Sequence, residues 1–458
     1  MTQSADPSQP SSWLARLLRR LFPAQPPVRG PHQELDDRRE ATTRVQVRLI
    51  EEAFGQLGGL AMSRKEGEDE AYLCHPSRLL TRGSDNVRRL DVFFDQRKDL
   101  YEGRGRIVEE VAGDLLAYEL PSRRDERVVD VEGLLAEVER DNDGADVARP
   151  DHIVYLTPRG FGQLCPATEP ELPLGKGPVP AQTDNREAGR GVRVSVVDSG
   201  WYAAAETNPE TPWLAGNIEG DLETVNPAAI HPYAGHGTFV AGVIRCLAPA
   251  TYIEIEGVLT KAGAVYESEI TKELNEAMTD EDRPQLISIS AGCRTRRDLG
   301  LIGFEALAQK YELTKGDGAV LVVAAAGNDA TKRPFYPAAY PWVLSVGALD
   351  EDMTVSDFSN YGDWVDVYAH GRDLVNAFPT GTYTCHEPAH AGEVRSFTGM
   401  AQWSGTSLAT PVVTGLVAAH MSEHGVNARD AVAALVAAGL SVTDPGGLSK
   451  PVVGPPFV

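Results

Sequence analysis

Three short motifs of this chain place an aspartate, a histidine and a serine beside glycine or small residues. They are, in chain order, residues 196–200 (VVDSG), 235–238 (GHGT) and 404–411 (SGTSLATP). A serine hydroxyl becomes an effective nucleophile when a base within hydrogen-bond reach takes its proton, and histidine can be that base. A carboxylate on the other ring nitrogen holds the imidazole in the required tautomer. Asp198, His236 and Ser407 are therefore the candidate catalytic residues of an acyl-transfer site.

The segments around these residues predict elements that would bring them together. Val192–Val197 is an apolar, β-branched run, typical of a buried parallel strand that ends at Asp198. Open α/β sheets carry their sites at that edge. The residues after His236 predict a buried helix.

Ser407 begins another predicted helix, Leu408–Met421, and Pro411 is expected in its first turn, where a missing N–H costs little. The N–H groups at the start of a helix suit a developing oxyanion.

A fourth motif supplies a candidate for the oxyanion site. Asn328 follows the apolar run 319–324, which predicts a strand, and its side-chain amide can donate to a tetrahedral intermediate. A single Asp-Ser-Gly or Gly-Thr-Ser is usually a turn or a loop. Four such motifs in one order, each at a predicted strand end or helix start, indicate a catalytic site and not a chance occurrence.

The motifs and their order resemble those of the subtilisin-like serine proteases, or subtilases, over roughly residues 185–445. The resemblance implies an α/β fold, a mostly parallel, doubly wound sheet with helices on both faces. It also implies that Ser290, Ala291 and Gly292 form a strand that pairs with the peptide substrate. Ala326 and Gly327, beside the oxyanion asparagine, are expected to bind substrate as well.

The side-chain pocket that the resemblance implies involves residues 324–327 and 336–340. These are small or aromatic and bear no charge that could oppose a charged substrate. We therefore expect uncharged P1 residues, P1 being the residue before the cleaved bond.

Length and composition predict more than one domain, because 458 residues exceed what one core usually carries. We expect a disordered tail over 1–37, a smaller α+β domain over 38–165, a linker over 166–190, the catalytic domain over 191–445 and a C-terminal tail over 446–458. A short basic amphipathic stretch lies within the first tail at 13–22.

The 38–165 region is expected to hold two helices, over 39–57 and 131–139, and three strands, over 91–94, 115–120 and 151–156. Its last strand, next to the protease region, loosely resembles the end of a subtilase prodomain. This implies intramolecular inhibition by residues 38–165. An independent regulatory or partner-sensing domain is the alternative.

The net charge of −23 and the absence of a large basic patch argue against a nucleic-acid partner. No run is apolar and long enough for a transmembrane segment, and no convincing signal peptide is present. Five scattered cysteines are typical of free thiols in a reducing compartment. We expect a cytoplasmic enzyme, with an unrecognised export route as the alternative.

No cofactor and no metal site are predicted from the motifs. Many subtilases bind structural calcium, but no residues here can be assigned as its ligands, and residues 280–282 are expected to be a solvated acidic loop.

The function predicted is a serine endopeptidase that hydrolyses polypeptide substrates through an acyl-enzyme on Ser407. Two alternatives from other classes stay open. One is a transpeptidase or macrocyclase that passes the acyl group to an amine. The other is a catalytically silent binding protein, which the intact set of motifs disfavours.

Overall fold

A computed structural model describes residues 49–50, 52–55, 61–63, 72–156, 168–175, 177–260, 262–279, 283–315, 320–387 and 390–454. The expected tail, 1–37, lies outside these residues, as does the acidic loop 280–282. Of the helix predicted over 39–57, residues 49–50 and 52–55 are described, and both pieces are helical.

A seven-stranded sheet in the order β14-β13-β12-β10-β6-β8-β7 forms the centre of the catalytic domain, and every neighbouring pair is parallel. Its central strands β10, β12 and β13 are buried throughout and almost continuously apolar, as strands covered on both faces must be. Their bounds are β6 Arg193–Asp198, β7 Ile218–Gly220, β8 Tyr252–Gly257, β10 Leu286–Ile289, β12 Leu321–Ala325, β13 Leu344–Leu349 and β14 Val367–His370.

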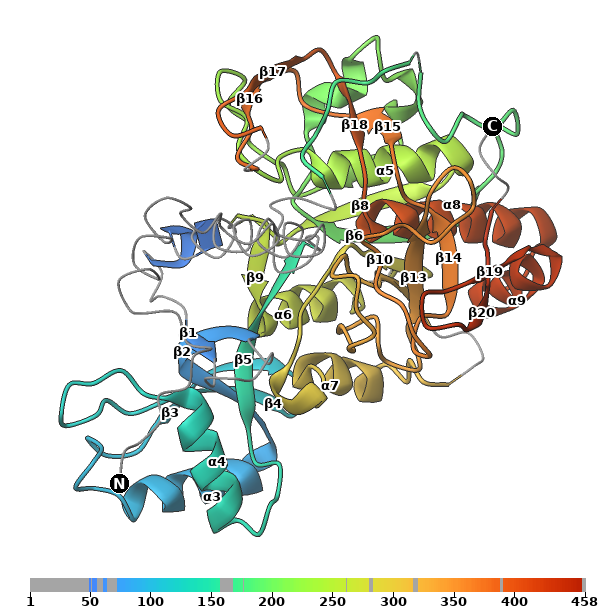
Figure 1. Cartoon of the computed structure of the whole chain (residues 1–458). Helices are drawn as coiled ribbons and strands as arrows, with labels where there is room; N and C mark the ends of the chain where they lie inside the picture. Colours follow the sequence, from blue (N-terminus) through green and yellow to red (C-terminus); the bar gives the residue numbers. More distant parts are fainter. Residues whose placement is uncertain are drawn as a thin grey trace, which may run out of the picture.

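Helices cover both faces of this sheet (Figure 1). Helices α5 (His236–Leu247) and α8 (Thr406–His424) pack against each other on one face. Helices α6 (Glu267–Ala277) and α7 (Ile302–Lys310) lie on the side that faces the N-terminal domain. Helix α9 (Ala428–Ala438) follows α8 and packs on it.

Smaller elements surround the large sheet. Among the described residues, the two-stranded antiparallel pairs are β15 Leu374–Ala377 with β18 Met400–Trp403, β16 Gly381–Thr384 with β17 Val394–Phe397, and β19 Ser441–Thr443 with β20 Ser449–Pro451. The short 3₁₀ turns are η1 Ala203–Thr207, η2 Pro212–Leu214 and η3 Arg296–Asp298. Among the described residues, no helix is long and apolar enough to cross a membrane.

The N-terminal domain is an antiparallel sheet with two helices, α3 (Gly83–Asp95) and α4 (Val131–Asp141), on one face. Asp130 caps α4 by accepting a hydrogen bond from the Gly133 N–H. The strands are β1 Ala61–Ser63, β2 Tyr72–Arg82, β3 Arg106–Ala112, β4 Leu115–Glu119 and β5 Arg149–Leu156.

The opposite face of this N-terminal sheet is buried by the catalytic domain. Leu80, Leu115 and Ala117 pack against Ile302 and Ala306 of α7. The sheet itself also continues into the catalytic domain, because β5 pairs with β9 (Ala264–Tyr266) on one side and with β11 (Ala291–Gly292) on another. In Figure 1, β5 runs out of the N-terminal domain alongside β9. The two domains therefore share one sheet and apolar contacts, which include Leu73 and Ile153 against Ala264 and Tyr266.

One predicted strand of the N-terminal domain was wrong. Residues 91–94 lie in α3, where Leu90, Phe93 and Phe94 are buried and Val92 is 49% exposed. The three buried residues follow the i, i+3, i+4 spacing of a helix, which outweighs the strand preference of the Val-Phe-Phe run.

The segment expected to be a linker packs against the catalytic domain where the structure describes it. Glu169 is 2% exposed. Isolated backbone β-bridges pair Glu171 with Gln402 and Val179 with Val375. Of the expected C-terminal tail, the structure describes residues 446–454. They contribute β20, and Val452 is buried beside Tyr368.

Candidate active site

Asp198, His236 and Ser407 meet at the carboxyl edge of the parallel sheet. Asp198 ends β6, His236 is the first residue of α5, and Ser407 lies in the first turn of α8. Gly237 makes the approach of α5 to β6 possible, because a Cβ there would lie 2.6 Å from the Gly200 carbonyl oxygen and 3.2 Å from the Cβ of Asp198. The expected convergence is what the structure contains.

The three side chains form a continuous chain of hydrogen bonds. Asp198 Oδ1 and Oδ2 lie 2.7 Å and 2.9 Å from His236 Nδ1, and His236 Nε2 lies 3.2 Å from Ser407 Oγ. Because an ionised carboxylate only accepts, Nδ1 donates to Asp198 and Nε2 accepts from the Ser407 hydroxyl. All three residues are 0% exposed, so no separate substrate reaches them in this arrangement.

Asn328 contacts Thr406, the neighbour of Ser407, and its amide is held in one orientation. Its Oδ1 accepts hydrogen bonds from the backbone N–H and from the hydroxyl of Thr406, both at 2.9 Å. The oxygen end of the amide is thereby fixed, which defines the direction of the Nδ2 donor end. The Ser407 backbone N–H belongs to the first turn of α8, whose N–H groups have no acceptor inside the helix.

Pro411 lies in the second turn of α8, not in the first as predicted, because the helix already begins at Thr406. A proline four residues after Ser407 leaves the Ser407 carbonyl without its usual helical donor. The Ser290 hydroxyl donates to that carbonyl at 3.1 Å. This contact joins the end of the segment Ser290–Gly292 to Ser407.

Ala291 and Gly292 form β11, which pairs antiparallel with the end of β5. Leu156 lies opposite Ala291, and Tyr155 lies opposite Gly292. On its other side Leu156 donates its N–H to the Gly263 carbonyl at 2.8 Å. The segment expected to bind an extended peptide thus holds the chain's own β5.

Ala326 and Gly327 precede Asn328 in the turn after β12. Asn360 supports this turn by donating to the Ala326 carbonyl at 2.7 Å, and the Gly327 N–H donates to the Thr406 hydroxyl at 3.1 Å. Gly327 has a φ of +96°, and a Cβ there would press on the Asn360 amide, so glycine is required.

Sequence reasoning missed Glu223, a buried carboxyl near Asp198. Its Oε2 accepts the Gly235 N–H at 2.7 Å, and its Oε1 lies 3.9 Å from His231 Nε2. Burial raises the pKa of Glu223 to about 8, and the negative charge of Asp198 adds to the effect. No motif identified Glu223, because the glutamate lies outside the Gly-His-Gly-Thr segment that it supports.

Sequence reasoning also missed Trp403, whose indole ring lies edge-on to the His236 imidazole with centroids 5.3 Å apart. Trp403 donates its Nε1–H to the Thr168 carbonyl at 2.6 Å, so the segment that follows residues 157–167 passes close to the site. Leu156 thus pairs beside the segment bonded to Ser407, and Thr168 is bonded to the tryptophan that contacts His236.

Within the described residues, one group of three carboxylates lies close enough to share a cation: Asp221, Glu256 and Glu273. Burial raises the pKa of Glu256 to about 7. Asp221 and Glu256 already accept hydrogen bonds from Gly257 and Ser195. Calcium takes six to eight oxygen ligands, so these three carboxylates do not by themselves make a calcium site.

Glu223 predicts a specific dependence of stability on pH. Between pH 4.5 and about 8 the folded protein keeps a proton on Glu223 that the unfolded chain has lost. Folding then takes up a proton, so this group's contribution to stability falls as pH rises, by up to about 1.4 kcal/mol per pH unit. Glu223→Gln keeps an acceptor for Gly235 but removes the slope.

The measurement is thermal unfolding from pH 5 to 9 in a Ser407→Ala background, which prevents self-digestion. The melting temperature of Glu223→Gln relative to the parent should increase with pH and level off above pH 8. Parallel profiles for the two proteins would contradict a buried, protonated Glu223.

Comparison with known proteins places these residues in a family. The Subtilase family (peptidase S8) matches residues 189–439, more than half of the chain. An intracellular serine protease of Paenibacillus polymyxa is 33% identical over 270 residues, 54% of this chain and 72% of the relative. Thermitase of Thermoactinomyces vulgaris is 31% identical over 258 residues, 54% of this chain and 80% of the relative.

A solved structure, that of a cold adapted subtilisin-like serine proteinase, covers 62% of this chain and 93% of its own at 23% identity and a TM-score of 0.45. The family match spans the parallel sheet and every motif around Asp198, His236, Asn328 and Ser407. The chain belongs to the subtilase family, has the α/β fold of subtilisin, and is a serine endopeptidase that acts on polypeptides.

Proposed function

We propose that Ser407 is the nucleophile, His236 the general base and then general acid, and Asp198 the residue that orients His236. The hydrogen-bond chain from Asp198 through His236 to the Ser407 hydroxyl carries this proposal. Asn328 and the Ser407 backbone N–H are proposed to donate to the oxyanion. The Thr406 contacts support the role of Asn328, because they fix its amide before any substrate binds.

In the proposed reaction, Ser407 Oγ attacks the substrate carbonyl carbon while its proton moves to His236 Nε2. The positive charge on the imidazole faces the buried Asp198 carboxylate. His236 then protonates the departing amine, and a water molecule, deprotonated by His236, releases the acyl group. The relatives' names as serine proteases favour water over an amine as the acceptor, and they also disfavour a silent binding protein.

We propose further that the N-terminal region, residues 38–165, inhibits the catalytic domain within the same chain. The end of β5 lies on β11 and β9 as an extended peptide substrate would, in antiparallel register. Asp198, His236 and Ser407 are fully buried in this arrangement. An independent sensor domain would have no need to place its last strand on the substrate-binding segment.

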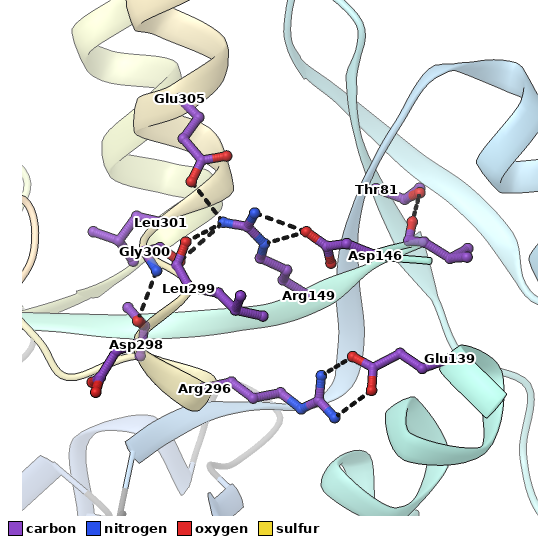
Figure 2. Close-up of polar contacts among 12 residues, drawn as sticks. Thr81, Glu139, Asp146, Arg149, Arg296, Asp298, Leu299, Gly300, Leu301 and Glu305 are labelled. Atoms are coloured by element: carbon purple, nitrogen blue, oxygen red, sulfur yellow. Dashed lines mark hydrogen bonds and ion pairs between the residues drawn. The ribbon is translucent and has the colours of Figure 1, made fainter. Parts of the chain in front are cut away.

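Ion pairs between the two domains support this role (Figure 2). Arg149, which begins β5, donates to Glu305 of α7 and to the Leu299 carbonyl, both at 2.8 Å. Arg296 is 1% exposed and pairs with Glu139 of α4. It also pairs with Glu132 at 2.9 Å. Breaking a buried pair of this kind costs about 3–5 kcal/mol.

Polar groups of β5 also complete the start of α6. The residue that precedes α6, Tyr266, makes no side-chain cap. Instead Asp151 accepts hydrogen bonds from the N–H and the hydroxyl of Ser268. Its neighbour His152 accepts the Arg296 N–H and donates to Glu267 at 2.9 Å. The N-terminal domain thus supplies the helix cap that the catalytic domain lacks.

A reducing compartment, and hence the cytoplasm, is part of the proposal. Cys74, Cys246, Cys293 and Cys385 are free and buried, as in proteins that do not rely on disulfides. One relative is named an intracellular serine protease. Structural calcium stays a prediction from the family resemblance, without assigned ligands.

Ser407→Ala should abolish peptide hydrolysis and labelling by a fluorophosphonate while the fold is kept, because the acyl-enzyme cannot form.

We expect the wild-type chain to cut itself within residues 157–167. This segment follows Leu156, which pairs with Ala291 of β11, and precedes Thr168, whose carbonyl accepts a hydrogen bond from Trp403. Intact-mass spectra of purified wild type and Ser407→Ala provide the comparison. A stable, active and uncut wild-type chain would overturn the inhibitory role of residues 38–165.

Asn328→Ala should lower kcat by about 10²–10³ with little change in KM, the loss known for the equivalent donor of subtilisin. The donor acts on charge that develops in the transition state, so substrate binding is nearly unaffected. Steady-state kinetics on a chromogenic peptide measure both constants. A change confined to KM would make Asn328 a substrate contact instead.

Glu139→Gln should weaken docking of the N-terminal domain by about tenfold to a hundredfold, because it removes a charge that faces buried Arg296. Full-length Glu139→Gln should then reach its maximal peptidase rate earlier than wild type. Glu137→Gln is the matched control: Glu137 lies on the same helix but pairs with Arg97 inside the N-terminal domain. Identical time courses for all three proteins would exclude the Arg296–Glu139 contact as a restraint.

A further inference from the structure

Helix α5, whose first residue is His236, is capped at its start by side chains from two other segments. Gly235, the residue before the helix, has no side chain that could accept a hydrogen bond. Its N–H donates to Glu223 Oε2 at 2.7 Å, and the Gly237 N–H donates to Ser199 Oγ at 3.2 Å. A capping box satisfies N–H groups of the first turn and of the residue before it with a serine and a glutamate from the helix terminus itself. Here both acceptors come from elsewhere in the chain and bond on either side of the histidine.

The same two side chains are joined to Asp198. Ser199 follows Asp198 directly, and its N–H donates to Asp198 Oδ1 at 2.8 Å. Its hydroxyl also hydrogen-bonds with the Glu223 carboxyl. Gly200 leaves room for this arrangement, because a Cβ there would lie 3.1 Å from the Glu223 Cβ. Glu223 and Ser199 thus connect the backbone on both sides of His236 to the end of β6.

At neutral pH Glu223 makes these contacts without adding a second charge beside Asp198. Its side chain is 5% exposed, and burial raises its pKa to about 8. The ionisable side chains that face it are Asp198 at the end of β6 and His231 of the loop before α5, whose Nε2 lies 3.9 Å away on a side chain that is 47% exposed. His236 follows the glycine that Glu223 binds. Above pH 8 an ionised Glu223 adds a negative charge near this histidine, which favours the imidazolium form.

Resting on the proposed role of His236 as the general base, we infer that Glu223 is a positioning residue that holds His236 against Asp198 and acts on the charge of its imidazole. The geometry that it maintains is the 2.7 Å distance from Asp198 Oδ1 to His236 Nδ1 and the 3.2 Å distance from His236 Nε2 to Ser407 Oγ. Glu223 acts through the Gly235 N–H and through Ser199. Its loss therefore affects the chemical step and not the binding of substrate.

The first test measures kcat and KM at pH 7 with a tetrapeptide p-nitroanilide, on full-length protein that has reached its maximal rate. Glu223→Ala leaves the Gly235 N–H without its acceptor and should lower kcat by about 10- to 100-fold, the cost of a small misplacement of a catalytic group. KM should change little. Glu223→Gln has the shape of the protonated glutamate and keeps an acceptor, so it should recover most of the lost kcat.

The second test follows kcat of wild type and Glu223→Gln from pH 6 to 9.5. The ratio of wild type to variant should rise between pH 7 and 9 and then level off, because glutamine cannot ionise. The expected rise is at least about twofold, which is what a unit charge contributes even from about 10 Å in water. A carboxyl that only stabilised the fold would leave this ratio constant.

Glu256→Ala is the matched control. Glu256 is 9% exposed, burial raises its pKa to about 7, and it accepts a hydrogen bond at 3.1 Å from Ser195, three residues before Asp198 on β6. Removing this buried carboxyl should change the melting temperature but keep the wild-type kcat. Thermal unfolding reports the folding of each protein.

Three results would overturn the inference while leaving the proposed function intact. They are a folded Glu223→Ala protein with wild-type kcat, a folded Glu223→Gln protein as slow as Glu223→Ala, and a ratio of wild type to Glu223→Gln that stays constant with pH. If Glu223→Ala does not fold, the pH comparison decides, because it needs only wild type and the glutamine variant. Failure of every folded protein, wild type included, to hydrolyse the substrate, together with no fluorophosphonate labelling of Ser407, would instead overturn the proposed function and the inference with it.

Discussion

The pairing of β5 with β9 and β11 joins the two domains and determines what the active site contacts. Through this strand the main-chain hydrogen bonds of the N-terminal sheet continue onto the segment that ends at Ser290. The other face of that sheet is covered by α7 rather than by its own helices. The N-terminal domain therefore buries both faces of its sheet only when it is docked, and Ser407 is fully buried in this docked arrangement.

The catalytic geometry depends on elements that are rigid for reasons of their own. Asp198 ends a strand inside the parallel sheet, while His236 and Ser407 begin buried helices. Pro411 removes one helical hydrogen bond, and Ser290 replaces it, which couples the segment Ser290–Gly292 to Ser407. Small errors in any of these positions would change the 3.2 Å contact between His236 and Ser407.

The sequence predicted these positions well because each motif coincides with an element boundary. The apolar run before Asp198 and the helices after His236 and Ser407 all appear as expected. Contacts between residues distant in sequence could not be predicted, such as the support of Asn328 by Thr406 or of Gly235 by Glu223. No periodicity links such pairs, because their proximity arises only when the sheet is assembled.

Prediction was weaker in the N-terminal domain, for identifiable physical reasons. Strand β2 was not predicted: it contains Pro76, and its register with β5 shifts between Cys74 and Leu79, so simple alternation is lost. In α3 the local strand preference of residues 92–94 conceals the helical spacing of the buried side chains. Both errors concern a domain whose sheet is stabilised in part by contacts with α7 of the catalytic domain. These contacts cannot be predicted from the sequence of the N-terminal domain alone.

The contacts between the two domains are partly apolar and partly ionic, and the two kinds constrain the position of β5 differently. The apolar contact on α7 favours association without strong directional demands, whereas Arg149, Arg296 and His152 require one register of β5. A slip of β5 by one residue would leave these buried polar groups unpaired, which costs more than the contacts contribute when satisfied. The ionic groups therefore determine which residues of β5 lie on β11, so that Leu156 and not a neighbouring residue lies opposite Ala291, next to the Ser290 that is bonded to Ser407.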